Sequence, residues 1–175
     1  GPEEIRKAAR RLLREGADQL KIWVSGGDNW PHDRSSDTHY TLEEVKALVD
    51  EAHMIKGTLC CAHAENTESI KICIDAGIDT IEHGEDLDEE CAELMAQKNM
   101  ILVPTTALLL SWYTEICPAN GQQTDTRKKI RPDAFFYREL DDKPDIEYGN
   151  SFVKQVLDNF ELAKSKGVKI ALGSD

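Results

Sequence analysis

Four residues whose side chains can bind metals or transfer protons stand in, or at the end of, short apolar runs: Lys21, His63, His83 and Asp175. The runs DQLKIWVSGG, TLCCAHAE, DTIEHG and VKIALGSD have the length and composition of β-strands. His63 and His83 are twenty residues apart, about one helix plus one strand. In a parallel α/β barrel the carboxyl ends of the strands converge on one face. The spacing therefore predicts one metal site built from residues far apart in the sequence.

Each of these residues also has a purely structural interpretation. A single histidine at a strand end can be a hydrogen-bonded core residue, although two of them one repeat apart favour zinc ligation by neutral imidazoles. A buried ammonium at Lys21 is unfavourable unless it is paired or chemically changed, but its stem can also extend to the end of the barrel. Asp175 could cap a following helix. Glu82 precedes His83, so it is expected to point to the opposite face and to pair with a helix residue.

Helices and strands are predicted to alternate along the chain. Strands are expected at 18–25, 58–63, 78–83, 100–104 and 168–173, and helices at 2–16, 41–56, 66–76, 87–98 and about 147–166. The second helix begins with a capping box, TLEE, and glycines follow several helix ends. This alternation predicts a parallel sheet with helices packed outside it.

Residues 1–175 are interpreted as one domain with a long insertion. The segment 105–146 is too long for a simple connection, so it is predicted to be a lid or binding loop, or else a surface insertion with short helices. Five strands are counted, whereas a closed barrel of this type has eight. The predicted fold is therefore α/β, a partial (β/α)8 TIM barrel. Its open strand edges would be covered by the rest of a longer chain or by a homo-oligomer.

A family resemblance rests on five segments in this order: GADQLKIWVSGG, LEEVKALVDEAH, CAHAENTESIKICIDAGIDTIEHGEDLDEE, ILVPT and GVKIALGSD. Together they resemble the amidohydrolase superfamily of metal-dependent hydrolases. Within it the chain is most similar to the branch related to imidazolonepropionase, which includes Xaa-Pro dipeptidases. The resemblance covers most of 1–104 and 147–175 and implies the C-terminal portion of a (β/α)8 barrel. The family's first strand carries an HxH motif, and no HxH occurs in this sequence.

The resemblance implies one or two divalent metals, usually zinc, and a role for each of the four residues. Lys21 would be carboxylated by CO2, giving a carbamate whose two oxygens bridge two cations. His63 and His83 would ligate one metal, while Asp175 would contact the other and act as general base. The implied reaction is hydrolysis of an amide or peptide bond by metal-activated water, as in a dipeptidase or an acyl-amino-acid hydrolase.

Substrate contacts are expected from two loops. The candidates are His32 and His39 after the lysine strand, and Trp112, Tyr113 and Arg131 in the long insertion. An arginine there could pair with a substrate carboxylate, although each of the five can also be an ordinary surface residue. Two other functions remain open: a non-catalytic barrel fragment that keeps a metal half-site, and a lactone or phosphoester hydrolase of the same superfamily.

The charge and composition of the chain disfavour several classes of binding partner. The sequence has 33 acidic and 21 basic residues and a net charge of −12, which disfavours nucleic acid and anionic membranes, so a small-molecule or dipeptide-like substrate is expected. No apolar run approaches the ~20 residues needed to span a bilayer, and the first residues lack a signal peptide's apolar stretch. The five cysteines show no CxxC pair, which indicates reduced thiols in a cytoplasmic protein.

Overall fold

The computed structural model describes residues 1–27, 32–106 and 146–173. In chain order the elements are α1 Pro2–Arg14, β1 Gln19–Trp23, α2 Leu42–His53, β2 Leu59–Ala64, α3 Thr67–Ala76, β3 Thr80–His83, α4 Glu89–Gln97, β4 Ile101–Val103, α7 Ile146–Ser165 and β5 Lys169–Ile170. Each predicted strand and helix is found close to its expected place. The last strand is much shorter than predicted, because only its two residues pair with β4. Within the described residues, no helix is both long and apolar enough to cross a bilayer.

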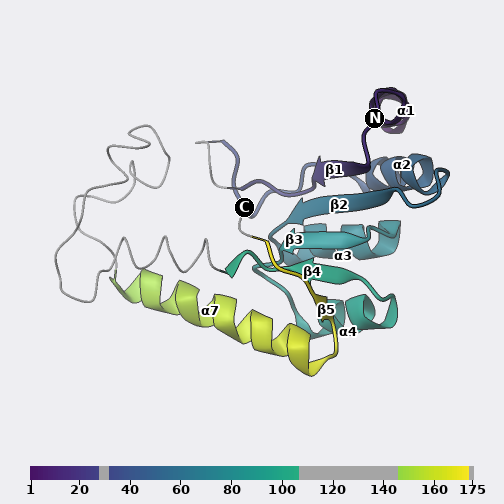
Figure 1. Cartoon of the computed structure of the whole chain (residues 1–175). Coiled ribbons are helices and arrows are strands. Elements are labelled where there is room, and N and C mark those ends of the chain that lie inside the picture. Colours follow the sequence, from purple (N-terminus) through teal and green to yellow (C-terminus); the bar gives the residue numbers. More distant parts are fainter. Residues whose placement is uncertain (28–31, 107–145, 174–175) are drawn as a thin grey trace.

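The strands form a single sheet in which each strand pairs in parallel with the next one in the sequence, in the order β1-β2-β3-β4-β5. Figure 1 shows them stacked in this order, with their carboxyl ends toward the left of the view. Parallel neighbours need a crossover connection, which the intervening helices provide. The predicted α/β fold with five parallel strands is confirmed for the described part of the chain.

Local sequence signals account for the ends of the helices. Thr41 and Glu44 form the predicted capping box of α2, in which each side chain bonds the backbone N–H of the other residue. Asn66 caps α3 by accepting the N–H of Ser69. Gly77 ends the same helix in the left-handed conformation, with φ +87°, which a glycine adopts without steric cost. These caps set the points at which the chain turns back toward the sheet.

The hydrophobic core lies between the sheet and its helices. Leu20 and Ile22 of β1 are buried, whereas Lys21 and Trp23 point to the other face and are more exposed. The core also contains the most buried residues of the neighbouring strands and helices, among them Val45, Ile70, Ile81, Met95 and Leu102. The opposite face of the sheet carries Lys21, Trp23, His63 and Glu82, together with smaller apolar residues of β2 and β4.

The described cysteines are free, buried thiols: Cys60, Cys61, Cys73 and Cys91. This agrees with the prediction of reduced thiols, while Cys117 lies outside the described residues. Burial raises the pKa of the Cys60 and Cys91 thiols to about 12, so both are protonated at neutral pH. These thiols therefore act as small apolar core residues.

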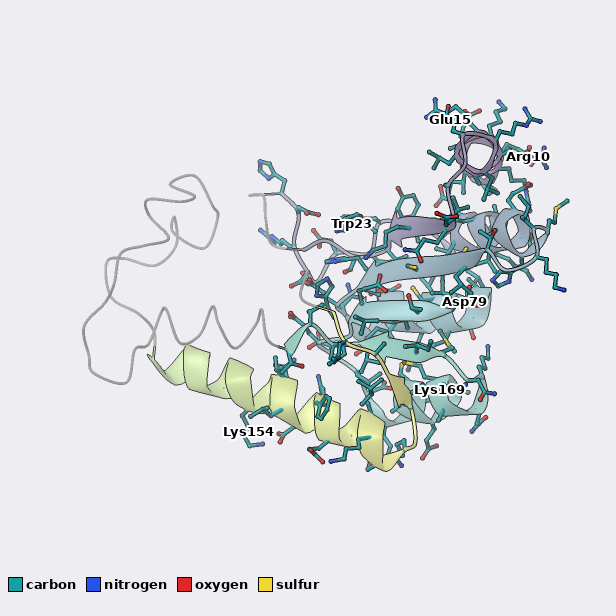
Figure 2. All side chains as sticks on the ribbon, in the orientation of Figure 1. Arg10, Glu15, Trp23, Asp79, Lys154 and Lys169 are labelled. Carbon is teal, nitrogen blue, oxygen red and sulfur yellow. The ribbon has the colours of Figure 1, made fainter. Side chains whose placement is uncertain are left out.

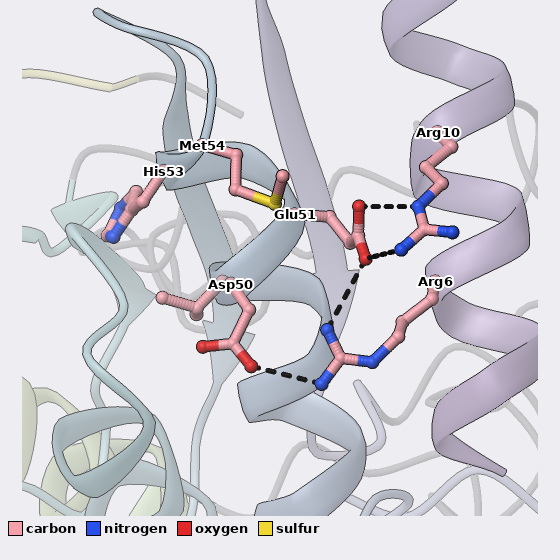
Figure 3. A pocket seen from close by; sticks show the side chains of 7 residues that line it. Arg6, Arg10, Asp50, Glu51, His53 and Met54 are labelled. Carbon is pink, nitrogen blue, oxygen red and sulfur yellow. Dashed lines mark hydrogen bonds and ion pairs between the residues drawn. The ribbon is translucent and has the colours of Figure 1, made fainter.

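A cluster of ion pairs, drawn in Figure 3, fastens α1 to α2. The buried carboxylate of Glu51 accepts hydrogen bonds from Arg10 Nε at 2.7 Å and Nη2 at 2.6 Å. Arg6 donates to the same carboxylate at 3.4 Å and to Asp50 at 3.0 Å. The groove beside them, about 580 Å³, is lined by these paired groups, so we assign it to the helix interface.

Candidate metal centre

His63 and His83 meet at the carboxyl ends of two neighbouring parallel strands, β2 and β3. Their ring centroids are 4.6 Å apart, with an angle of 67° between the ring planes. Both residues are buried, with exposed fractions of 4% and 8%. The structure thus brings together the two histidines that the twenty-residue spacing singled out.

The backbone of His83 departs from the strand geometry that precedes it. In the sheet, Glu82 pairs with His63 and His83 pairs with Ala64, so strict alternation would point the His83 side chain away from the face that carries His63. His83 has φ +72°, a left-handed value that interrupts the alternation at the last residue of β3. As a result its ring lies against the ring of His63.

Thr105, just after β4, holds the other side of the His83 ring. Its hydroxyl oxygen lies 2.8 Å from His83 Nδ1, and the residue is 3% exposed. Thr105 also has a positive φ, +44°, which is unfavourable for a β-branched residue by about 1–3 kcal/mol. Two strained residues that contact each other mark this end of the sheet. With Nδ1 engaged by Thr105, Nε2 is the nitrogen of His83 suited to a metal.

The His63 ring is held on its edge and on its face. Its Nε2 lies 3.0 Å from the carbonyl oxygen of Gly26 and 3.3 Å from Oε1 of Glu65. The indole of Trp23 stacks on the ring with centroids 5.4 Å apart and an interplanar angle of 26°. Figure 2 labels Trp23 at the carboxyl end of β1, and Asp79 farther to the right, near the start of β3.

Lys21 lies on the same face of the sheet, but as an ion-paired, partly exposed side chain. Its Nζ is 2.6 Å from Oε2 of Glu82 and 5.3 Å from the centroid of the Trp23 ring. The Lys21 side chain is 37% exposed, so the premise of a buried ammonium is wrong for the described structure. The expectation that Glu82 points away from the site to pair with a helix residue is also wrong. Register explains this, because Glu82 pairs with His63 in the sheet and so shares its face.

Glu65 is a site residue that the spacing of the histidines did not predict. It is 8% exposed, and one oxygen of its carboxylate and one ring nitrogen each of His63 and His83 lie within 4.8 Å of one another. A signal was present in the sequence, since Glu65 follows His63 at a spacing of two residues. Imidazole nitrogens are donors that zinc takes in hydrolase sites, and Glu65 adds a buried carboxylate beside them, so this group of residues fits a divalent metal.

The remaining predicted site residues are either away from the histidine pair or outside the described residues. His32 is exposed, and His39 pairs with Asp33 at 3.3 Å, while the His39 N–H donates to the Val24 carbonyl and ties the loop to the end of β1. The described contacts bring neither histidine to the ring pair. Four predicted site residues lie outside the described residues, together with most of the proposed lid: Trp112, Tyr113, Arg131 and Asp175.

A second polar cluster lies at the opposite end of the strands. His53 Nε2 is 2.8 Å from Oδ2 of Asp79, and the same oxygen accepts the backbone N–H of Cys60 at 2.7 Å. These bonds connect the end of α2 to the starts of β2 and β3. In barrels of this type the end at which the strands begin serves stability, so we assign this cluster to the packing of the fold.

The sequence and the fold are both similar to those of known hydrolases. A model of the amidohydrolase family matches residues 1–175. The ochratoxinase of Aspergillus niger is 34% identical over 109 residues, which make up 62% of this chain and 22% of that protein. Its crystal structure matches 100% of this chain and 34% of its own, with a TM-score of 0.76 and 26% identity.

Two solved peptidases are similar to the same extent. A prolidase in complex with N-methylphosphonate-L-proline matches with a TM-score of 0.75 and 29% identity, over 100% of this chain and 38% of its own. A Xaa-Pro dipeptidase with methionine bound in its active site matches with a TM-score of 0.73 and 33% identity, over the same shares of the two chains. The chain thus spans 22% to 38% of the length of these proteins.

Proposed function

The chain belongs to the amidohydrolase family, and on this basis we propose that it carries the metal centre of a hydrolase that cleaves amide bonds in small, dipeptide-like substrates. The observation that carries the proposal is the buried pair of His63 and His83 at the carboxyl ends of adjacent parallel strands. Similar proteins include an ochratoxinase and two proline-specific peptidases, one with a proline phosphonate and one with methionine bound. These ligands support a small substrate built from one or two amino-acid residues.

His63 and His83 are the proposed ligands of one metal, and Lys21, in carboxylated form, is the proposed bridge to a second. A divalent metal here, most simply zinc, supplies Lewis-acid activation of water and of the scissile carbonyl. Asp175 is proposed to accept the proton of the attacking water and to pass it to the leaving amine.

Carboxylation has a direct consequence for Lys21. The reaction of its neutral amine with CO2 forms an N–C bond, releases one proton and leaves an anion, so the ion pair with Glu82 is lost. Two neighbouring anions repel each other unless cations lie between them. We therefore expect carboxylation to require the metal, with the Lys21–Glu82 ion pair belonging to the metal-free protein.

The test combines metal analysis with turnover. Native mass spectrometry in bicarbonate with trace zinc should show bound zinc and an added CO2, and Xaa-Pro dipeptides should release proline. Asp175→Asn should keep the fold and the bound zinc and lose most turnover, because it removes the proposed base. Bound zinc without turnover on any amide substrate would instead support the metal half-site alternative, and unchanged turnover in Asp175→Asn would exclude the proposed base.

A further inference from the structure

We infer that Glu65 is a positioning residue that selects which nitrogen of His63 faces the metal, an inference that rests on the proposed metal centre. Glu65 Oε1 lies 3.3 Å from His63 Nε2, and the Gly26 carbonyl oxygen lies 3.0 Å from the same nitrogen. A carbonyl oxygen only accepts hydrogen bonds, as does an ionised carboxylate. Both neighbours therefore favour a proton on Nε2, which leaves Nδ1 as the lone-pair nitrogen of the neutral ring.

The plane of the His63 ring is fixed independently of this choice. Trp23 stacks on one face at 5.4 Å, and the His83 ring meets His63 edge-on at 4.6 Å. Within that plane, the rotamer and the position of the proton decide which nitrogen is a donor and which is a ligand. The two oxygens beside Nε2 are both acceptors, so they favour the rotamer and tautomer in which Nε2 is the donor. The metal-facing nitrogen is thus set by Gly26 and Glu65 together.

The backbone of Glu65 is itself held from two sides. Its N–H donates to Ser25 Oγ at 3.0 Å, and its carbonyl oxygen accepts the Asp86 N–H at 2.8 Å. Ser25 in turn donates its hydroxyl to the carbonyl oxygen of Gly26 at 2.9 Å. Ser25 therefore connects the Gly26 carbonyl, one acceptor at His63 Nε2, to the backbone of Glu65, whose side chain provides the other. Glu65 is thus a buried residue, 8% exposed, whose backbone is fixed by its neighbours, as expected of a residue that orients a ligand.

The Glu65 carboxylate can form a stronger hydrogen bond with His63 than the Gly26 carbonyl oxygen can. A hydrogen bond to an ionised acceptor is about twice as strong as one between neutral groups. Carboxylate–histidine–metal arrangements fix the tautomer and increase the basicity of the ligand, and their loss lowers metal affinity about 10–100-fold. We therefore expect Glu65→Ala to lower zinc affinity by about 10–100-fold. Glu65→Gln should lower it less, because its amide oxygen still accepts the Nε2–H while the charge is gone.

The experiment reads the tautomer and the metal affinity separately. Long-range ¹H–¹⁵N correlation spectra of the metal-free protein at pH 8, above the ordinary histidine pKa of about 6.5, report which ring nitrogen carries the proton. Zinc affinity is measured by chelator competition on the same samples. Glu51→Gln serves as a matched control, since it removes another buried carboxylate from a different part of the fold. His83, held by Thr105, is an internal control.

The expected result is an Nε2–H tautomer of His63 in the wild type and in Glu65→Gln, and a larger Nδ1–H population in Glu65→Ala. His83 and the Glu51→Gln spectra should not change. A wild-type tautomer and zinc affinity in Glu65→Ala would overturn the inference. So would a loss of zinc affinity with an unchanged His63 tautomer, because Glu65 would then act as a metal ligand. If the wild type binds no zinc but the tautomer responds as expected, the proposed function fails while the orienting role of Glu65 stands.

Discussion

Replacing Gly26 by alanine tests whether the backbone beside the metal centre orients His63. A Cβ at this position would lie 2.2 Å from the carbonyl oxygen of Arg34 and 2.6 Å from its carbonyl carbon. Both atoms belong to the backbone, so no side-chain rotation relieves the overlap. Real Cβ atoms essentially never come within 3.0 Å, and going from 2.2 Å to that distance requires a shift of 0.8 Å between the two segments.

This shift is large compared with the hydrogen bond that depends on it. The Gly26 carbonyl oxygen accepts from His63 Nε2 at 3.0 Å, and a displacement of 0.8 Å along the bond would lengthen it to 3.8 Å. Such bonds are normally 2.7–3.2 Å long, so the interaction would be lost. Overpacking of this kind costs about 1–3 kcal/mol of unfolding free energy. Loss of a partner of a ligand histidine lowers metal affinity about 10–100-fold.

Both effects are measurable on one pair of samples. Urea unfolding of the metal-free protein gives the stability change, and competition with a chelator gives the zinc affinity. Gly57→Ala is the matched control, because Gly57 has φ +90°, a Cβ added there would meet nothing within 4 Å, and the residue lies in the connection between α2 and β2. It should lose about 1–2 kcal/mol through backbone strain and keep its zinc affinity. Wild-type zinc affinity in Gly26→Ala would refute the reasoning.

Two further predictions concern the rest of the fold. Glu51→Gln should lower the free energy of unfolding at pH 7 by about 1–2 kcal/mol, near the low end for charge-assisted bonds because Arg10 is 56% exposed. The hydrogen bonds from Arg10 lower the folded-state pKa of Glu51, so its contribution is complete above the unfolded value of about 4.3 and is lost as the pH falls through the folded pKa. Urea unfolding should therefore show the difference from wild type shrinking below about pH 4, and a constant difference down to pH 3 would contradict this. In a Cys117→Ser variant, the four buried thiols should resist a thiol-reactive disulfide reagent at pH 8 and react only in denaturant, since burial raises the pKa of Cys60 and Cys91 to about 12. Fast labelling of the native protein would show that the core opens readily.

The sequence was most informative where one local rule decides the structure. The capping box at Thr41 and the glycine at Gly77 located helix ends, because each satisfies backbone groups within a few residues. The regular alternation of elements predicted the parallel sheet. The repeat of twenty residues between His63 and His83 predicted that both stand at strand ends, and the structure places them in contact.

Local sequence rules could not predict side-chain contacts that depend on the register between strands. Lys21 pairs with Cys61 on β2, and Cys61 pairs with Thr80 on β3, so Glu82 lies two residues farther along the same face. The Lys21 side chain spans the intervening strand, since its Nζ lies 2.6 Å from Oε2 of Glu82. The ion pair between Lys21 and Glu82 thus follows from the relative shift of three strands, and no single strand contains that information.

The conformation of His83 shows why the site could not be built from alternation alone. On the β4 side, the pairing of β3 ends at Glu82, so His83 is held in the sheet only through Ala64 of β2. The next residue, Gly84, also has a positive φ, +66°, and a Cβ there would lie 2.8 Å from Leu102 Cδ1. The glycine therefore lets the chain turn left-handed directly over the core, and His83 turns with it. The strain at His83 and Thr105 is held by the bond between their side chains and by the burial of both residues. Because Gly84 packs on buried Leu102, the geometry of the proposed ligand depends on the packing of the sheet.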